Sequence, residues 1–228
     1  MKPASASPPR RFGLSRADRV GWIITIVLCI SLVIGWTVVK RQRQAAERDW
    51  SVHSLKSLGL VLQEFAAEHG CYPDESTAPA VKTATGTDLD LSGSTSNRLF
   101  RQLIASGLKS ERPFFSKFGG SRKPDNLFEN DATALAPGEC GYWYLTSDGS
   151  GQWGPEAVLA MTPLLKGSTR FDPEPLGGMA VILYQSNAAR VLPIQRDGQV
   201  LSPLTGKSLL DPQDPCWHGH PPVIHECE

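Results

Sequence analysis

Cysteine and histidine gather in one short stretch near the end of the chain, "CWHGHPPVIHEC" at residues 216–227. Thiolate and imidazole are the ligands that zinc and copper prefer, so His218, His220 and His225 are candidate metal ligands. Their spacing matches no common zinc module, and two other interpretations stay open. In one of them a disulfide closes this tail, and in the other the histidines face solvent and bind nothing.

The cysteines outside the apolar N-terminal stretch are even in number, which permits a disulfide framework. They are Cys71, Cys140, Cys216 and Cys227, whereas Cys29 lies within the apolar stretch. Four cysteines allow three pairings, and the sequence does not choose among them. Disulfides need an oxidising compartment, and in a reducing one the same residues would be buried thiols. The count therefore favours a domain outside the cytoplasm.

No pattern in the remaining sequence indicates catalysis. Ser150 lies between two glycines but lacks the Gly-x-Ser-x-Gly spacing of a hydrolase nucleophile. The Gly-rich stretches lack the Lys-Ser/Thr ending of a phosphate-binding loop. We therefore expect a protein that is not an enzyme and has no cofactor, with zinc or copper at the Cys/His tail as the alternative.

The formal net charge of zero conceals an asymmetry between the two ends of the chain. Residues 1–40 hold six Lys or Arg against one acidic residue, a net of +5, so the remainder carries −5. A mildly acidic domain behind a basic tail offers no basic surface for nucleic acid. We expect a membrane and other proteins as partners instead.

Residues 20–39, "VGWIITIVLCISLVIGWTVV", contain no charged residue. Twenty helical residues span about 30 Å, the thickness of a bilayer's hydrocarbon core, and Trp22 and Trp36 lie near the two interfaces. A buried core helix would not be flanked by arginines on both sides, and a signal peptide would be followed by a small-x-small site. We therefore expect a transmembrane helix over 20–39, preceded by a disordered basic tail over 1–19.

Basic residues are nearly balanced across this span, five before it and four after it, so the positive-inside rule discriminates little. The cysteine count favours a cytoplasmic N-terminus and an extracytoplasmic domain. We therefore expect a single-pass membrane protein.

Residues 40–70 predict an amphipathic helix that continues the span without a break, because the stretch contains no proline. Gly70 and Pro73 give its stop. Apolar residues recur at steps of three and four along one face, which we expect to pack on the domain that follows. These residues are Val52, Leu55, Leu58, Leu62 and Phe65.

Residues 71–228 predict an α+β domain with a small antiparallel sheet. Residues 74–97 have the composition of a loop, a short helix follows up to Gly107, and 109–140 have no clear period. Asp197-Gly198 is a hairpin signal, and Pro193 restricts its strand to an edge of the sheet. The expected strands lie at 141–146, 156–162, 178–186 and within 189–202.

This order of elements resembles the type IV pilin and type II secretion pseudopilin superfamily. The resemblance rests on residues 20–75, where an apolar span runs into "SLKSLGLVLQEFAAEHGCYPD", and on the later hairpin around Asp197-Gly198. It implies a long N-terminal helix packed on a small antiparallel sheet. It also implies a place in a bacterial inner membrane, and an assembly or interaction component of a secretion or surface system, with envelope or pilin-like proteins as partners. The alternative is a membrane-tethered metal-binding or redox domain that uses the Cys/His tail.

One segment departs from the family's pattern. Pilin precursors carry a basic leader, a glycine before the cleavage site and an acidic fifth residue after it, which Gly13 and Asp18 would match here. Arg16 and Arg19 interrupt the apolar run that should surround Asp18, and charged side chains are costly in lipid. We therefore expect a vestigial processing site, which puts both cleavage and polymerisation into a filament in doubt.

Overall fold

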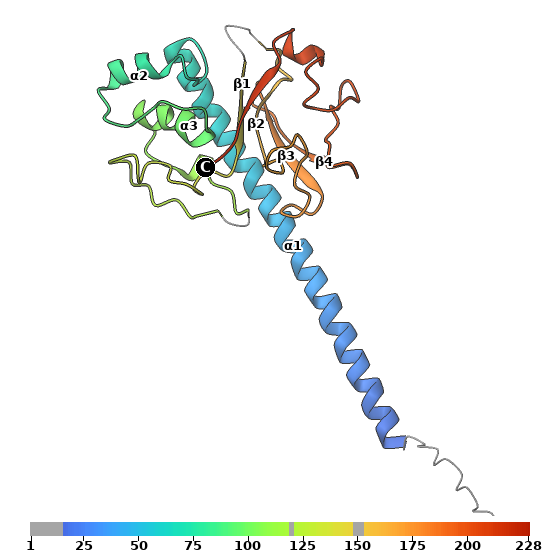
Figure 1. The fold of residues 1–228 in the computed structure, drawn as a ribbon. Helices are drawn as coiled ribbons and strands as arrows, with labels where there is room; N and C mark the ends of the chain where they lie inside the picture. Colours follow the sequence, from blue (N-terminus) through green and yellow to red (C-terminus); the bar gives the residue numbers. More distant parts are fainter. Residues whose placement is uncertain (1–15, 119–120, 148–152) are drawn as a thin grey trace, which may run out of the picture. The chain divides into compact units, whose positions relative to one another are not determined.

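A computed structural model describes residues 16–118, 121–147 and 153–228, without the side chains of residues 16–21, 23, 24 and 26. The chain divides into two compact units, residues 1–43 and residues 44–228. The second unit holds the sheet and the shorter helices (Figure 1).

The first helix, α1, runs from Arg16–His69 without interruption. Gly70 follows with a φ of +82°, and its N–H donates to the Ala66 carbonyl at 2.9 Å, so the helix ends in a left-handed glycine as the sequence predicted. Among the residues whose side chains are described, no helix contains an apolar stretch long enough to cross a bilayer.

Five antiparallel strands form one sheet in the order β4-β3-β2-β1-β5 (Figure 1). The first four follow one another along the sheet, and β5 returns to pair with β1, with Tyr144 opposite His225. A register shift between Val158 and Ala160 interrupts the pairing of β2 with β3. The strands are β1 (Trp143–Ser147), β2 (Val158–Met161), β3 (Met179–Tyr184), β4 (Ala189–Pro193) and β5 (Pro222–His225).

One face of the sheet packs against helices. The expected apolar face of α1 is buried there, with Leu55, Leu58 and Leu62 fully inaccessible to solvent and Phe65 3% exposed. Burying each of these side chains contributes about 1.5–3 kcal/mol to the hydrophobic stabilisation of the domain. The prediction of a long N-terminal helix packed on an antiparallel sheet in an α+β domain is thus confirmed.

Two further helices complete that face, α2 (Ala78–Thr85) and α3 (Ser96–Ala105). The hydroxyl of Thr95 caps α3 by accepting from the Arg98 N–H, and Phe100 of α3 packs on Tyr144 with ring centroids 4.9 Å apart. Short 3-10 turns lie at η1 (Arg112–Phe114) and η2 (Pro215–Trp217).

Irregular chain covers the other face of the sheet and forms a second apolar cluster. Trp143, Trp153 and Trp217 are buried in it, and the last two rings meet edge to face at 4.9 Å. Because alternate residues of a strand point to opposite faces, Trp143 enters this cluster while Tyr142 and Tyr144 face the helices.

Two sequence expectations about local structure need correction. Residues 78–85 are helical rather than loop, because Pro79 pre-sets the first turn and Gly86 at a φ of +64° closes the last. The turn at Asp197-Gly198 forms, but the strand expected after it is reduced to two isolated bridges, Ile194–Val200 and Leu201–Ser208. The sheet's own hairpin is instead β3–β4, with β4 at the edge as Pro193 predicted.

Candidate functional site

Within the second unit, α1 approaches the β3–β4 hairpin unusually closely at Gly59. A Cβ built on Gly59 would overlap the side-chain oxygen of Asn187 and lie 3.1 Å from Leu183. Three to four turns before Gly59 on the same helix, the Gln44 side chain donates to the Glu174 carbonyl at 3.1 Å, and Arg48 donates to the Leu176 carbonyl at 3.3 Å. The helix is therefore held by close packing on the β3–β4 hairpin and by hydrogen bonds to the segment that precedes β3.

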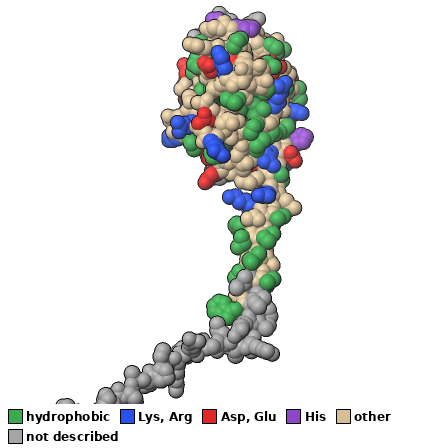
Figure 2. Space-filling model, turned by 90° about the vertical axis from the view of Figure 1, so that its right-hand side faces the viewer, with side chains coloured by type: hydrophobic (Ala, Val, Ile, Leu, Met, Phe, Trp, Pro, Cys, Tyr) green, Lys and Arg blue, Asp and Glu red, His purple; other side chains and the backbone are tan. Residues whose placement is uncertain are grey.

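The first unit presents a different surface. Every described side chain from Val27 to Val39 is exposed, and none of them is charged. Trp22 is 62% exposed and Trp36 74%. Figure 2 shows hydrophobic side chains repeating along this part of the helix. A continuous exposed apolar surface of this kind indicates contact with lipid or with another protein.

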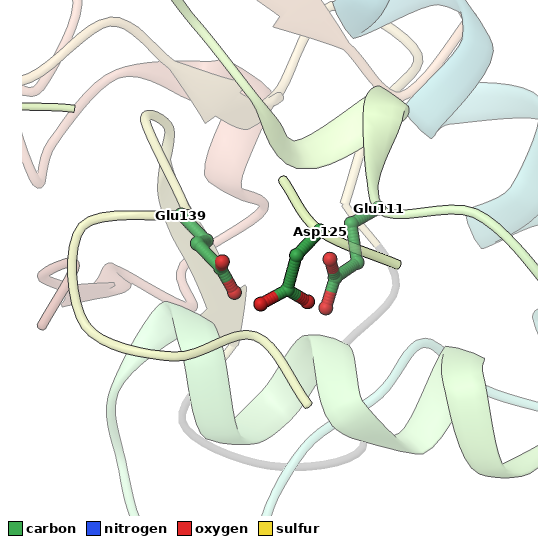
Figure 3. Close-up of side chains that lie close together, drawn as sticks. All are labelled: Glu111, Asp125 and Glu139. Atoms are coloured by element: carbon green, nitrogen blue, oxygen red, sulfur yellow. The ribbon is translucent and has the colours of Figure 1, made fainter. Parts of the chain in front are cut away.

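Three carboxylates, Glu111, Asp125 and Glu139, place oxygen atoms within 4.8 Å of one another (Figure 3). Among the described residues, this is the only such group of three His, Cys, Asp or Glu side chains. Carboxylate oxygens are the ligands that calcium and magnesium prefer, so the geometry alone would admit a hard cation.

Most of these oxygen atoms already accept from nearby groups. Glu111 accepts from the backbone N–H of Leu135 and of Asn126, both at 2.9 Å, and Glu139 accepts from that of Ala136 at 2.8 Å. Asp125 accepts from the Leu127 N–H at 2.9 Å. The carboxylates therefore fasten the irregular segment 109–140, where buried backbone donors would otherwise lack partners.

Arg122 supplies the positive charge of this cluster. Its guanidinium lies 3.0 Å from Asp125 Oδ2 and 3.4 Å from Glu139 Oε1. The Glu139 side chain is fully buried, and this Oε1 has no hydrogen bond in the described structure. Desolvation raises the pKa of Glu139, with smaller contributions from Glu111 and Asp125. The cluster thus holds the irregular segment in place, and the positive charge of Arg122 offsets part of its negative charge.

The three histidines of the tail are not gathered into a three-ligand site among the described residues. His225 is buried, its Nδ1 lies 2.6 Å from the Ser94 carbonyl, and its Nε2 lies 2.7 Å from the Thr146 hydroxyl. Nδ1–H therefore donates to the carbonyl and Nε2 accepts from the hydroxyl, which leaves neither nitrogen for a metal. His218 and His220 are exposed and follow η2.

The cysteines are all free, and the structure separates them into two kinds. Cys140 and Cys227 have their sulfur atoms 3.6 Å apart, whereas no other two described sulfur atoms are in contact. Cys71 is exposed. Burial and the neighbouring Asp214 raise the pKa of the Cys216 thiol to about 12, which disfavours the thiolate that binds metals.

The remaining predicted site lies outside the described part of the chain. Gly13 precedes the described residues, and Asp18 lies in the first turns of α1 with its side chain outside the description. The predicted processing site is therefore untested.

Sequence reasoning missed the carboxylate cluster entirely. Its members are 14 residues apart in an irregular segment, and no periodicity or motif connects them. The buried arginine of α3 was missed as well: Arg101 donates to the carbonyls of Ala134 and Asp131, both at 2.7 Å. The partners of Arg101 can be identified only from the fold, which brings α3 against residues 131–134.

The fold and contacts define a domain of α+β class whose first helix extends beyond it in sequence. No protein-family model matches the chain, and neither curated proteins nor solved structures give a significant match.

Proposed function

We propose that this chain is a single-pass envelope protein of pilin-like build, which serves as an assembly or interaction component of a secretion or surface system. Residues 20–39 lie in the bacterial inner membrane, the N-terminus is cytoplasmic and residues 71–228 form the extracytoplasmic domain. The observation that carries the proposal is the change in surface along α1: apolar and exposed on all described sides over 27–39, then buried on one side over 51–65.

The membrane part is supported by this surface and by the sequence. Residues 20–39 contain no charge, and Lys40, Arg41 and Arg43 follow immediately, where they would lie among headgroups. Water is a poor solvent for this many exposed apolar side chains, and about twenty such residues suit a bilayer.

Contact through helices is supported by the two edges of the sheet. The edge strand β4 ends in Pro193, and the edge strand β5 begins with Pro222. Proline cannot donate to a ladder, so both edges are poor templates for adding a strand from another protein. The exposed apolar surface of residues 27–39 therefore suits another anchored helix best, either from a second copy of this chain or from a protein of similar build.

Membrane extraction tests the anchor. Full-length protein should stay in the pellet when bacterial membranes are washed with alkaline carbonate, and the double variant Leu28→Lys/Leu32→Lys should be released. Leu60→Lys is the matched control, because Leu60 is also exposed on α1 but lies outside the span. Wild-type protein found in the supernatant would refute the anchor. Protease added to spheroplasts should digest the domain, and protection of the domain there would refute the orientation.

Crosslinking in living cells tests the assembly role. A photoreactive residue at position 60, which is 60% exposed on α1, should give a discrete adduct with another membrane-anchored subunit or a second copy. Position 204, which is 69% exposed in the segment between β4 and η2, is the control and should give none. No adduct at position 60, or an equal adduct at both positions, would contradict helix-mediated assembly.

A further inference from the structure

Cys140 and Cys227 meet although they are 87 residues apart in the sequence. Their sulfur atoms lie 3.6 Å from each other, and both approach the Tyr142 carbonyl, at 3.4 Å and 3.1 Å. Extending the register of β1 with β5 by two residues places Cys227 opposite Tyr142, so the contact follows from the strand pairing. A small rotation of the two thiols would close the distance to the roughly 2.05 Å of a disulfide.

The backbone on both sides of Cys227 is fixed by hydrogen bonds to α3 and its N-cap region. The Ser96 N–H donates to the Glu226 carbonyl at 2.9 Å, and the Glu228 N–H donates to Asn97 Oδ1 at 3.0 Å. The Gly138 N–H also donates to the Glu228 carbonyl at 2.9 Å. Cys227 cannot move far from its neighbour while these bonds hold.

Cys140 is held equally well. Gly141 beside it donates to the Phe114 carbonyl at 2.9 Å, and the N–H of Glu139 donates to the Ala136 carbonyl at 3.0 Å. Cys140 is buried, whereas Cys227 is only partly buried, so Cys227 is the member of the pair that lies nearer to solvent. The pair therefore has a fixed geometry, with one buried member and one partly buried member.

We propose that Cys140 and Cys227 are a disulfide-forming pair, and that the bond fastens the segment 222–228 to the start of β1. This pairing rests on the domain alone and not on the proposed anchor. The other two cysteines of the domain, Cys71 and Cys216, remain thiols because, in the part of the chain that the structure describes, no other sulfur atom is in contact with either.

A disulfide-bearing oxidant such as oxidised glutathione supplies the chemistry by two exchange steps. The Cys227 thiolate attacks one sulfur of the oxidant, and the first glutathione leaves as a thiolate that takes up a proton. The Cys140 thiolate then attacks the Cys227 sulfur of the mixed disulfide, and the second glutathione leaves in the same way. Two protein thiols are oxidised, and the oxidant accepts both electrons. Hydrogen bonding to Cys140 and burial raise the pKa of the Cys227 thiol, so the reaction should accelerate as the pH rises.

The experiment uses the full chain in detergent with Cys29, Cys71 and Cys216 replaced by serine. After incubation with oxidised glutathione, the intact mass should fall by two hydrogen atoms, and the denatured protein should take up no N-ethylmaleimide until it is reduced. Adding Cys140→Ser should stop the reaction at a stable mixed disulfide with one glutathione. Two alkylatable thiols in the oxidised sample, or a glutathione that stays on Cys227 when Cys140 is present, would overturn the proposal.

Thermal unfolding of the same sample gives a second readout that does not depend on comparing variants. The oxidised form should unfold about 10 °C above the reduced form, since closing a loop of this length removes much chain entropy from the unfolded state. Equal midpoints would contradict a bond that fastens 222–228. If the triple variant does not fold, Cys216→Ser alone suffices, because it leaves Cys227 as the one cysteine of the tryptic peptide 208–228. Trypsin digestion of the oxidised variant should then release this peptide linked by a reducible bond to the peptide 123–166, which contains Cys140.

The state of the pair in cells separates this proposal from the proposed function. Acid-quenched membranes should contain the bond if the domain is extracytoplasmic. A pair that is reduced in cells but closes with oxidised glutathione would support the pairing and contradict the placement of the domain.

Discussion

The side-chain oxygen of Asn187 lies where a Cβ on Gly59 would have to stand. Asn187 belongs to the β3–β4 turn and has a φ of +61°, and Gly59 lies on the buried side of α1. A glycine inside a helix costs about 1 kcal/mol relative to alanine, so its presence here needs a compensating reason. The close approach of the helix to the hairpin is that reason.

Gly59→Ala should therefore destabilise the domain, although the same change stabilises an ordinary helix. We expect a net loss of about 1–2 kcal/mol, because overpacking costs more than the gain in helix propensity. Denaturant unfolding of the full chain in detergent measures the effect. Asn187→Gly should restore most of the loss in the double variant, since glycine tolerates this φ and removes the obstructing side chain. A Gly59→Ala variant more stable than wild type would show that the contact is absent.

Leu62→Ala should cost about 2–5 kcal/mol of unfolding free energy, because it removes a fully buried side chain between α1 and the sheet. Leu60→Ala is the matched control: it lies two residues away on the same helix, is 60% exposed and should change stability by less than about 0.5 kcal/mol. Both values come from the same denaturant titration. Similar losses at the two positions would mean that the helix does not bury the face assigned to it.

Glu111→Ala should lower the unfolding free energy by about 3 kcal/mol, because it leaves the buried N–H of Leu135 and the N–H of Asn126 without an acceptor. Glu111→Gln should lose less, since its single oxygen still serves one of the two donors. The control is Glu129→Ala, an exposed glutamate in the same irregular segment. If Glu111→Ala unfolds at the same denaturant concentration as the control, the carboxylate does not fasten this segment.

His225 should make the domain less stable in mild acid. Burial lowers its pKa in the fold below the ordinary 6.5, so the unfolded chain binds a proton at a higher pH than the folded chain does. The unfolded state gains protons first as the pH falls below about 6.5, and stability must fall there. Unfolding curves from pH 7.5 to 5.5 should show this loss in wild type.

The loss should be smaller in His225→Asn and unchanged in His53→Asn, which removes an exposed histidine of α1. A His225→Asn variant with the same pH slope as wild type would show that this imidazole does not carry the effect.

The elements with strong hydrophobic periodicity could be predicted from the sequence. The stripe of Leu55, Leu58, Leu62 and Phe65 located the buried face of α1, because a polar residue at any of these positions would interrupt the continuous apolar row. The aromatic and β-branched runs located four of the five strands, and Pro193 correctly indicated an edge.

The parts that depend on long-range contacts could not be predicted. The partners of β5 and of the Glu111 carboxylate lie far away in sequence, and no local pattern encodes them. The helix at Ala78–Thr85 was missed because its alanines and threonines resemble a loop in composition, whereas Pro79 and Gly86 fix its ends. The pairing of Cys140 with Cys227 is of the same kind: the sequence permits three pairings, and only the return of β5 to β1 brings these two sulfur atoms into contact.

The strand order implies a sequence of events during synthesis. Strands β1 to β4 pair with their neighbours in the order in which they are made, so a four-stranded layer can form as soon as residue 193 is available. Residues 222–225 join from the opposite side, beside a strand made about 75 residues earlier, and long-range pairings of this kind form late. Until they do, β1 presents an unpaired ladder of donors and acceptors, and this nascent intermediate is the species most exposed to misassociation.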